Sequence, residues 1–425
     1  MSNYPLPLLP KSAVHGAMAV VGLLAFGAGL WLIRGLRPWG GTWQPCLLLL
    51  LWNGAMLLGA DMLWNGVQLH ASTGLDRRRH DPSLARTAVK FLGLLGSLGF
   101  LALGYLTFPV YRDPLYVPFF SMLPVLLPLW LVAALPYLYL VDRRMREPQD
   151  GYWQMGELLL LRWRGLDRRM LGQHLLGWLV KGFFLPLMFG YMSQYMAQFL
   201  GYAGPAAATG KPVFDTAYAA MYFVDVTLVS VGYLATLRLT DTHIRSSDPT
   251  LLGWAVALIC YQPFWGFVSG RYLPYQTDYD WQGWLAAIPD VRAAWGGAIL
   301  LLTAFYLWAT LSFAARFSNL THRGIITNGP YRFTKHPAYL AKNLSWWLIA
   351  VPFLAQGGAW DGLSRCLMLL GVNLIYWLRA RTEERQLAHD PVYVQYALWM
   401  EDHGCLRYLT HLPGLGWLRF RVPSL

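Results

Sequence analysis

Ten long apolar segments restrict what this chain can fold into more than any other feature of its sequence. A bilayer core about 30 Å thick needs about 20 apolar residues in a helix, and inside it only helices and closed barrels satisfy every backbone hydrogen bond. Hydrophobic residues make up 56% of the 425 residues and charged residues only 13%, whereas soluble domains contain about 25% charged residues. We therefore predict an all-α, polytopic transmembrane helix bundle with about ten spans. They cover approximately residues 12–33, 44–66, 89–110, 115–141, 171–200, 213–237, 250–270, 293–316, 338–356 and 363–381.

The net charge of +12 resides mainly in the connections between these segments. Arginines are abundant at 67–90 and 142–170, whereas the alternate connections are poor in Lys and Arg and the one at 271–292 is acidic. The positive-inside rule describes this alternation, so we predict a multi-pass protein of a bacterial inner membrane with both termini in the cytoplasm. Because no basic helix or aromatic-lined strand pattern accompanies the charge, we expect no nucleic acid partner.

Two segments differ from simple spans. Four prolines in 115–141, at positions 118, 124, 128 and 136, predict kinks or a re-entrant piece. The segment 142–170 places leucines, Tyr152, Trp153 and Trp163 among arginines. It is either an amphipathic helix at the surface of an anionic leaflet or a plain cytoplasmic connector, and the sequence favours neither.

The four cysteines do not form a CxxC pair, and three of them lie in apolar segments. This pattern indicates neither a disulfide framework nor a zinc site. We expect no metal centre.

The segment 324–340, with sequence GIITNGPYRFTKHPAYL, is the richest in chemical groups. Gly329 and Pro330 mark a turn, and Pro337 suits the first turn of the span that follows. A helix N-terminus favours an anion, because its N–H groups are free and its dipole is positive, and Arg332 and Lys335 add two cations. The segment can therefore hold a carboxylate or phosphate, although basic residues also flank membrane helices routinely.

A second polar segment, 373–396, follows the last apolar run. Arg379 and Glu383 are four residues apart and share a helix face, and Glu384 follows directly. Carboxylates at the end of a membrane helix are costly unless they are paired or solvated. They could bind an ammonium group, or form ion pairs at a solvated helix end. The connection between the last two spans is short, so a helical hairpin would bring 329–340 and 379–396 to the same membrane face.

Together, GPYRFTKHPAYL, RTEERQL and DPVYVQY resemble the C-terminal signature of the isoprenylcysteine carboxyl methyltransferase family, which membrane phospholipid methyltransferases share. The resemblance covers residues 323–400. It implies a methyltransferase whose S-adenosylmethionine (SAM) site lies at the cytoplasmic end of the last helices. We accordingly divide the chain into an N-terminal multi-span region of unknown role, 1–292, and a methyltransferase-like module with a cytoplasmic tail, 293–425.

The resemblance assigns cofactor-binding positions residue by residue. The matching residues are Tyr331, His336, Pro337, Tyr339, Glu383, Glu384, Tyr393 and Tyr396. The chain departs from the family pattern at Lys335, where arginine is usual, and at Ala341-Lys342, where glycine often follows the tyrosine. Lys342 lies one turn into an apolar helix, so its charge needs a reason.

The residue types suit methyl transfer, which depends on alignment more than on acid–base catalysis. Arg332, Lys335 and His336 could bind the cofactor's carboxylate, and Glu383 or Glu384 its ammonium group. The rings of Tyr331, Tyr339 and Tyr393 could stabilise the sulfonium by cation–π contact. As catalytic residues we predict Glu383 and Arg379, the latter either orienting an acceptor carboxylate or holding Glu383.

The acceptor implied is a lipophilic small molecule or lipid-modified substrate with a carboxylate, amine or hydroxyl group, reached among membrane lipids. Two other functions stay open. One is an NADPH-dependent oxidoreductase similar to the sterol reductases, although the N-Y-x-G-D pattern usual in that family is missing, since Ala338 to Lys342 stand there. The other is a transporter or scaffold that retains a decayed methyltransferase module.

Charged residues within the apolar segments are the last candidates. Asp61, Lys181 and Asp225 are either structurally paired or functional. A Lys181–Asp225 ion pair would explain both charges, whereas a role in a substrate cavity is the alternative for Asp225.

Overall fold

A computed structural model describes residues 8–36, 41–201, 213–277, 279–410, 412 and 419–420. These residues are predominantly helical, as predicted. The helices are α1 (Met18–Leu36), α2 (Trp43–Asn65), α3 (Leu84–Thr107), α4 (Val117–Asp142), α5 (Gly151–Leu159), α6 (Arg168–Leu200), α7 (Val213–Leu234), α8 (Leu251–Leu258), α9 (Phe264–Phe267), α10 (Trp281–Trp284), α11 (Pro289–Leu311), α12 (Pro337–Ala350), α13 (Ala359–Leu387), α14 (Pro391–His403) and α15 (Arg407–Thr410). Two short strands, β1 (Ser246–Ser247) and β2 (Thr321–His322), pair antiparallel.

Eight helices in the described ranges are long and apolar enough to cross a membrane: α1, α2, α3, α4, α6, α7, α11 and α13. The chain is therefore an integral membrane protein with an all-α, polytopic fold, as predicted. Two of the ten predicted spans are not single long helices in the described ranges. The segment 250–270 is broken into α8 and α9, because Pro263 cannot continue a helix. In the segment 338–356, α12 ends at Ala350, and its 14 residues reach only about 21 Å.

The prolines of α4 do not produce a re-entrant piece. Pro124, Pro128 and Pro136 all lie inside one continuous helix of 26 residues.

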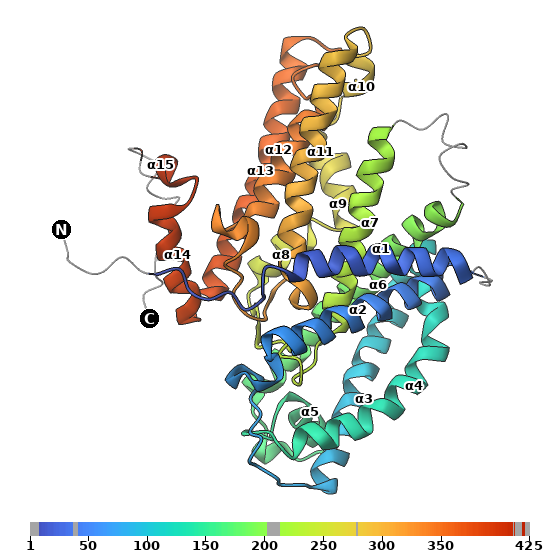
Figure 1. Ribbon diagram of the computed structural model, residues 1–425, viewed down its shortest axis with the longest axis vertical. Helices are drawn as coiled ribbons and strands as arrows, with labels where there is room; N and C mark the ends of the chain where they lie inside the picture. The colour runs from blue at the N-terminus through green and yellow to red at the C-terminus, as the bar shows by residue number, and fades with distance from the viewer. Residues whose placement is uncertain are drawn as a thin grey trace, which may run out of the picture.

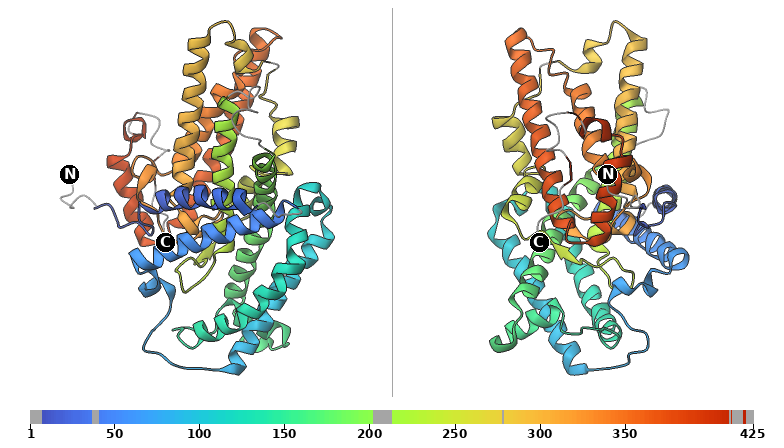
Figure 2. Two further views of the ribbon diagram at one scale, coloured as in Figure 1. Left: turned by 45° about the vertical axis from the view of Figure 1, so that its right-hand side comes forward. Right: turned by 90° about the vertical axis from the view of Figure 1, so that its left-hand side faces the viewer.

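The helices fall into two groups along the long axis of the molecule. Figure 1 shows α11, α12 and α13 side by side at one end, with α3, α4 and α5 at the other. The pair α1 and α2 runs across the axis between them, and Figure 2 shows the same arrangement from two further sides. Tightly buried apolar side chains from α1, α2, α6, α7 and α11 form the largest core cluster between the groups.

The segment 142–170 contains the short α-helix α5, which packs closely on α3, and a 3₁₀ helix at Trp163–Gly165. Two glycines make this contact possible: a Cβ at Gly93 would lie 1.9 Å from the Tyr152 carbonyl oxygen, and one at Gly156 would lie 2.1 Å from that of Val89. The connection that follows α5 is less covered, since Leu161 is 69% and Trp163 63% exposed.

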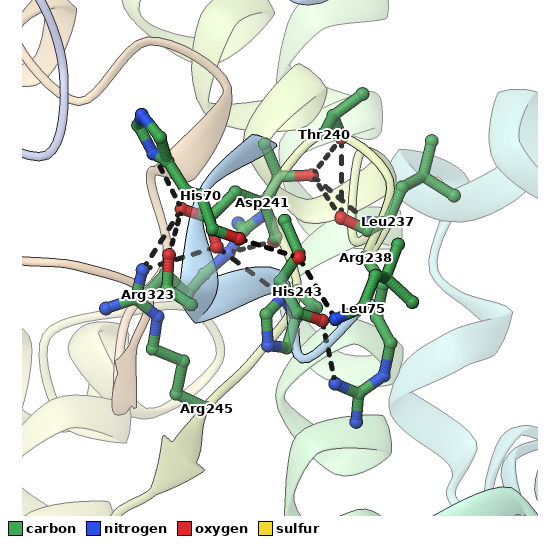
Figure 3. Close-up of polar contacts among 12 residues, drawn as sticks. His70, Leu75, Leu237, Arg238, Thr240, Asp241, His243, Arg245 and Arg323 are labelled. Atoms are coloured by element: carbon green, nitrogen blue, oxygen red, sulfur yellow. Dashed lines mark hydrogen bonds and ion pairs between the residues drawn. The ribbon is translucent and has the colours of Figure 1, made fainter. Parts of the chain in front are cut away.

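A buried polar junction joins the region before residue 293 to the C-terminal module. β1 and β2 pair across it, and Asp241 receives hydrogen bonds from Ser72 and Arg245. Figure 3 shows this cluster, in which His70, the 237–245 connection and Arg323 come together. Beside it, Asp61 forms a buried ion pair of 2.7 Å with Arg316.

Asp225 and Lys181 do not pair with each other, contrary to the pairing we considered. Asp225 accepts a hydrogen bond of 2.8 Å from the hydroxyl of Tyr306. Lys181 donates to Thr236 at 3.4 Å and lies over the ring of Trp178.

Candidate active site

The hairpin of α12 and α13 brings the two polar segments together, as the sequence predicted. A turn at Gly329–Arg332 leads into α12, whose first residue is Pro337. Gly329 has a φ of +56°, and a Cβ there would lie 2.6 Å from Ser312 Oγ, so glycine suits this turn on both counts. α13 ends at Leu387, and α14 then folds back with Asp390 as its N-cap and Pro391 as its first residue.

Glu384 lies among three basic side chains. Its Oε1 is 2.9 Å from Lys335 Nζ and 3.2 Å from His336 Nε2, and its Oε2 is 3.0 Å from Arg381. Lys335 also contacts Glu401 at 3.2 Å. The carboxylate of Glu384 is buried, so it fixes the positions of Lys335 and His336.

Glu383 points to the other side of the helix end and is more accessible, with 27% of its side chain exposed. Its Oε1 accepts a hydrogen bond from the hydroxyl of Tyr339 and lies 3.4 Å from Arg379 Nε. Its Oε2 lies 3.9 Å from His336 Nδ1. His336 therefore stands between the two glutamates.

Arg379 is buried and has several partners. Its Nη2 donates a hydrogen bond of 2.6 Å to Asn319 Oδ1. Its guanidinium carbon also lies 5.0 Å from the centre of the Tyr339 ring and 5.5 Å from that of Tyr261. With Glu383 as a further partner, this arrangement favours the second of its two predicted roles, holding Glu383.

A cavity opens beside these groups. Eight of the predicted site residues line it: Tyr331, Lys335, His336, Tyr339, Arg379, Glu383, Tyr393 and Tyr396. Three others are not among its lining residues. Glu384 lies behind Lys335 and His336, Pro337 is buried at the start of α12, and Arg332 is exposed.

The tyrosines at the cavity end formed by α14 stay neutral. Burial raises the pKa of Tyr331 and of Tyr393 well above the ordinary range, with nearby carboxylates acting in the same direction. The hydroxyl of Tyr396 donates to the carbonyl of Tyr331 at 2.7 Å. The buried hydroxyl of Tyr393 has no hydrogen-bond partner among the described residues, so it is free to bind a ligand.

Several residues of this cavity were not predicted from the sequence. Asn319 binds Arg379 and, through Nδ2, the hydroxyls of Tyr233 and Tyr261. Tyr261 and Tyr306 complete the wall. The only signal in the sequence was the polarity of Asn319 directly after an apolar segment, because Tyr261 and Tyr306 look like ordinary aromatic residues of membrane helices.

Comparison with known protein families agrees with this geometry. Residues 296–389 match the isoprenylcysteine carboxyl methyltransferase (ICMT) family. The match covers most of α11, the connection that follows it and the α12–α13 hairpin, and thus most of the cavity wall. It confirms the resemblance for this C-terminal part, and the ICMT family is one of membrane methyltransferases, which generally use SAM. No curated protein and no solved structure matches the chain.

Proposed function

We propose that this protein is a SAM-dependent methyltransferase that modifies a lipophilic acceptor taken from the bilayer. One observation carries the proposal: Lys335 and His336 from the start of α12 meet Glu383 from the end of α13 beside one cavity. A free amino acid group needs a cation for its carboxylate and an anion for its ammonium. The ICMT family match supports the proposal independently.

The residues present fit this cofactor. When bound, SAM supplies a methyl group activated by its sulfonium. Glu383 would bind the ammonium group, and Lys335 and His336, held by Glu384, would bind the carboxylate. The tyrosine rings would face the sulfonium, and the unpartnered hydroxyl of Tyr393 would hydrogen-bond the remaining polar part.

The proposal includes an orientation in the membrane. The arginine-rich connections at 67–90 and 142–170 favour the cytoplasm. The end of the hairpin with the site, and both termini, would then face the cytoplasm, where SAM is available.

The test is a search for the methylated product. Membranes containing the full chain are incubated with methyl-labelled SAM, and their lipid extracts are compared by mass spectrometry with extracts from membranes containing Glu383→Gln. We expect a lipid-soluble species that carries the label, in the first sample only. It should be heavier than its unmethylated acceptor by one CH₂ group, about 14 Da, plus the added mass of the isotopic label. Label that never enters the lipid extract would contradict the proposal.

A further inference from the structure

One face of α13 carries a stripe of leucines that leads to a pair of arginines. Four leucines of the stripe are exposed, with 49–56% of each residue accessible: Leu363, Leu367, Leu370 and Leu374. Leu378, Arg381 and Arg385 continue the same spacing of three or four residues, which keeps all these positions on one side of a helix. Because α13 is long and apolar enough to cross a membrane, the leucines of this face contact lipid acyl chains.

The two arginines lie at the depth of the lipid headgroups. At a rise of 1.5 Å per residue, α13 extends about 27 Å from Leu363 to Arg381 and about 33 Å from Leu363 to Arg385. The hydrocarbon core of a bilayer is about 30 Å thick. With Leu363 near one surface of this core, both guanidinium groups reach the opposite surface, where the phosphate groups of the lipids lie.

A pocket lies at the end of the stripe. Its lining residues are Leu378, Arg381, Thr382, Glu384, Arg385 and Ala388 of α13, Leu252 of α8, and Phe420. Among the residues that the structure describes, this pocket shares none with the cavity that we assign to SAM. It therefore combines cationic groups with apolar ones, Leu252, Leu378 and Phe420, at the level where a phospholipid changes from headgroup to acyl chain.

The arginines are held at the pocket by neighbouring groups. Arg381 lies 3.0 Å from Glu384, whose carboxylate also contacts two other basic side chains. Arg385 is exposed and donates a hydrogen bond of 2.7 Å to the hydroxyl of Thr250. This hydroxyl donates in turn to Asp248, so Asp248 acts on Arg385 through Thr250. Within the described ranges Arg385 forms no direct ion pair with a carboxylate, and two arginines face a single glutamate in the pocket.

We propose that this pocket binds the phosphate group of an anionic phospholipid, as a resident lipid outside the SAM cavity. Guanidinium groups form strong, often bidentate hydrogen bonds with phosphate oxygens, and basic pockets between membrane helices bind anionic headgroups. The acyl chains would lie against Leu374 and Leu378. A zwitterionic lipid would bring its choline cation close to Arg381 and Arg385, which disfavours its binding. The lipid is not the methyl acceptor, so this inference does not rest on the proposed function.

Lipid binding to the purified full chain, measured by native mass spectrometry, tests the proposal. The protein in detergent is titrated with phosphatidylglycerol or phosphatidylcholine of the same acyl chains, and sn-glycerol 3-phosphate is added as a competitor. We expect one phosphatidylglycerol to bind at least fivefold more tightly than phosphatidylcholine. Glycerol 3-phosphate at equal concentration should not displace it, because it has no acyl chain to lie on the leucines. Arg385→Gln should weaken phosphatidylglycerol binding about fivefold, and Arg385→Lys, which keeps the charge, should retain it within about twofold.

Arg77→Gln is the matched control, because Arg77 is an exposed arginine that does not line the pocket. It should bind phosphatidylglycerol like the unaltered protein. Equal affinity for the two lipids, or unchanged affinity in Arg385→Gln, would overturn the proposal, because the pocket would then not recognise the headgroup charge. Displacement by glycerol 3-phosphate at equal concentration would also overturn it, since the pocket would then serve a soluble phosphate. The comparison of the two lipids uses the unaltered protein and does not depend on the folding of any variant.

Discussion

Arg323 shows how single side chains hold the wall of the cavity in place. It lines the cavity and is only 3% exposed. Its guanidinium donates to the carbonyls of Gly232, Ala235, Thr242, Ala315 and Phe317. The planar fork of arginine satisfies these oxygens together, which a lysine cannot do.

Replacing Arg323 should therefore be severely destabilising. Arg323→Met leaves several buried carbonyls without a donor, and each unsatisfied group costs about 1–3 kcal/mol. We expect a lower melting temperature in detergent for Arg323→Met and a smaller decrease for Arg323→Lys. The exposed Arg77 provides the control, Arg77→Met, which should melt like the unaltered protein. Equal melting temperatures for all variants would show that the junction is not structural.

His243 in the same junction should make stability depend on pH. Burial, together with Arg238 and Arg245, lowers its pKa from 6.5 to about 3. The folded protein keeps His243 neutral, whereas the unfolded chain takes up a proton below pH 6.5, so stability falls as the pH decreases from 6.5 toward 3.

The measurement is the melting temperature between pH 7.5 and 4.5 for the unaltered protein and for His243→Gln. The variant should lose less stability on acidification. Some pH dependence remains, because burial also lowers the pKa of His322. Identical pH profiles would contradict the assignment to His243.

Among single residues, the sequence predicted those site residues that belong to a local motif. His336 and Glu383 could be predicted, because a short hairpin must bring its two ends together. Asn319, Tyr261 and Tyr306 could not be predicted, because only the tertiary packing places them at the cavity. Lys342 was visible as an anomalous charge, but its place over the rings of Tyr306 and Trp346 could be seen only in the structure.

Among the elements, the close contact of α3 and α5 depends on two small residues. The backbone of each helix occupies the space where the other's Cβ would lie at Gly93 and Gly156. The sequence did not decide between a surface helix and a connector for this segment, because hydrophobic patterning does not report how closely two helices approach.

A larger side chain at this crossing should separate the helices. We expect Gly156→Leu to reduce the melting temperature and to increase protease cleavage within 142–170. Gly165→Ala is the control, because a Cβ at Gly165 meets no atom within 4 Å. Unchanged cleavage of Gly156→Leu would contradict the tight contact.

The sequence predicted a continuous helix correctly for eight of the ten apolar segments and incorrectly for two. The apolar runs of α1 to α4, α6, α7, α11 and α13 are continuous helices. The run at 250–270 has the composition of a span, yet it breaks before Pro263, and Tyr261 at this break lines the cavity. The composition of a segment predicts whether it is apolar enough to lie in a membrane. It does not predict a break in the helix at a functional site, because that break depends on tertiary contacts.

For the whole molecule, the site is not confined to the ICMT-like module. Tyr261 from the preceding region forms part of the wall, β1 pairs with β2, and Arg323 binds carbonyls of α7 and the connection after it. The division at residue 293, which we predicted from sequence character alone, therefore does not separate two independent sites.

The module should accordingly fail to function alone. We expect residues 293–425, expressed in membranes, to aggregate on extraction and to bind no SAM, because Arg323 and Asn319 lose partners from the first region. Co-expression with residues 1–292 should restore a soluble complex in detergent. A monodisperse module that binds SAM by itself would contradict this dependence.

SAM binding to the purified full chain, measured by isothermal titration calorimetry, tests the central claim most directly. The claim predicts saturable binding, weakened at least tenfold in His336→Ala and in Glu383→Gln. Binding should be unchanged in Glu157→Gln, a variant of a residue on α5 whose carboxylate contacts Arg162. Absence of SAM binding, equal affinity in all four proteins, or binding of NADPH in place of SAM would contradict it.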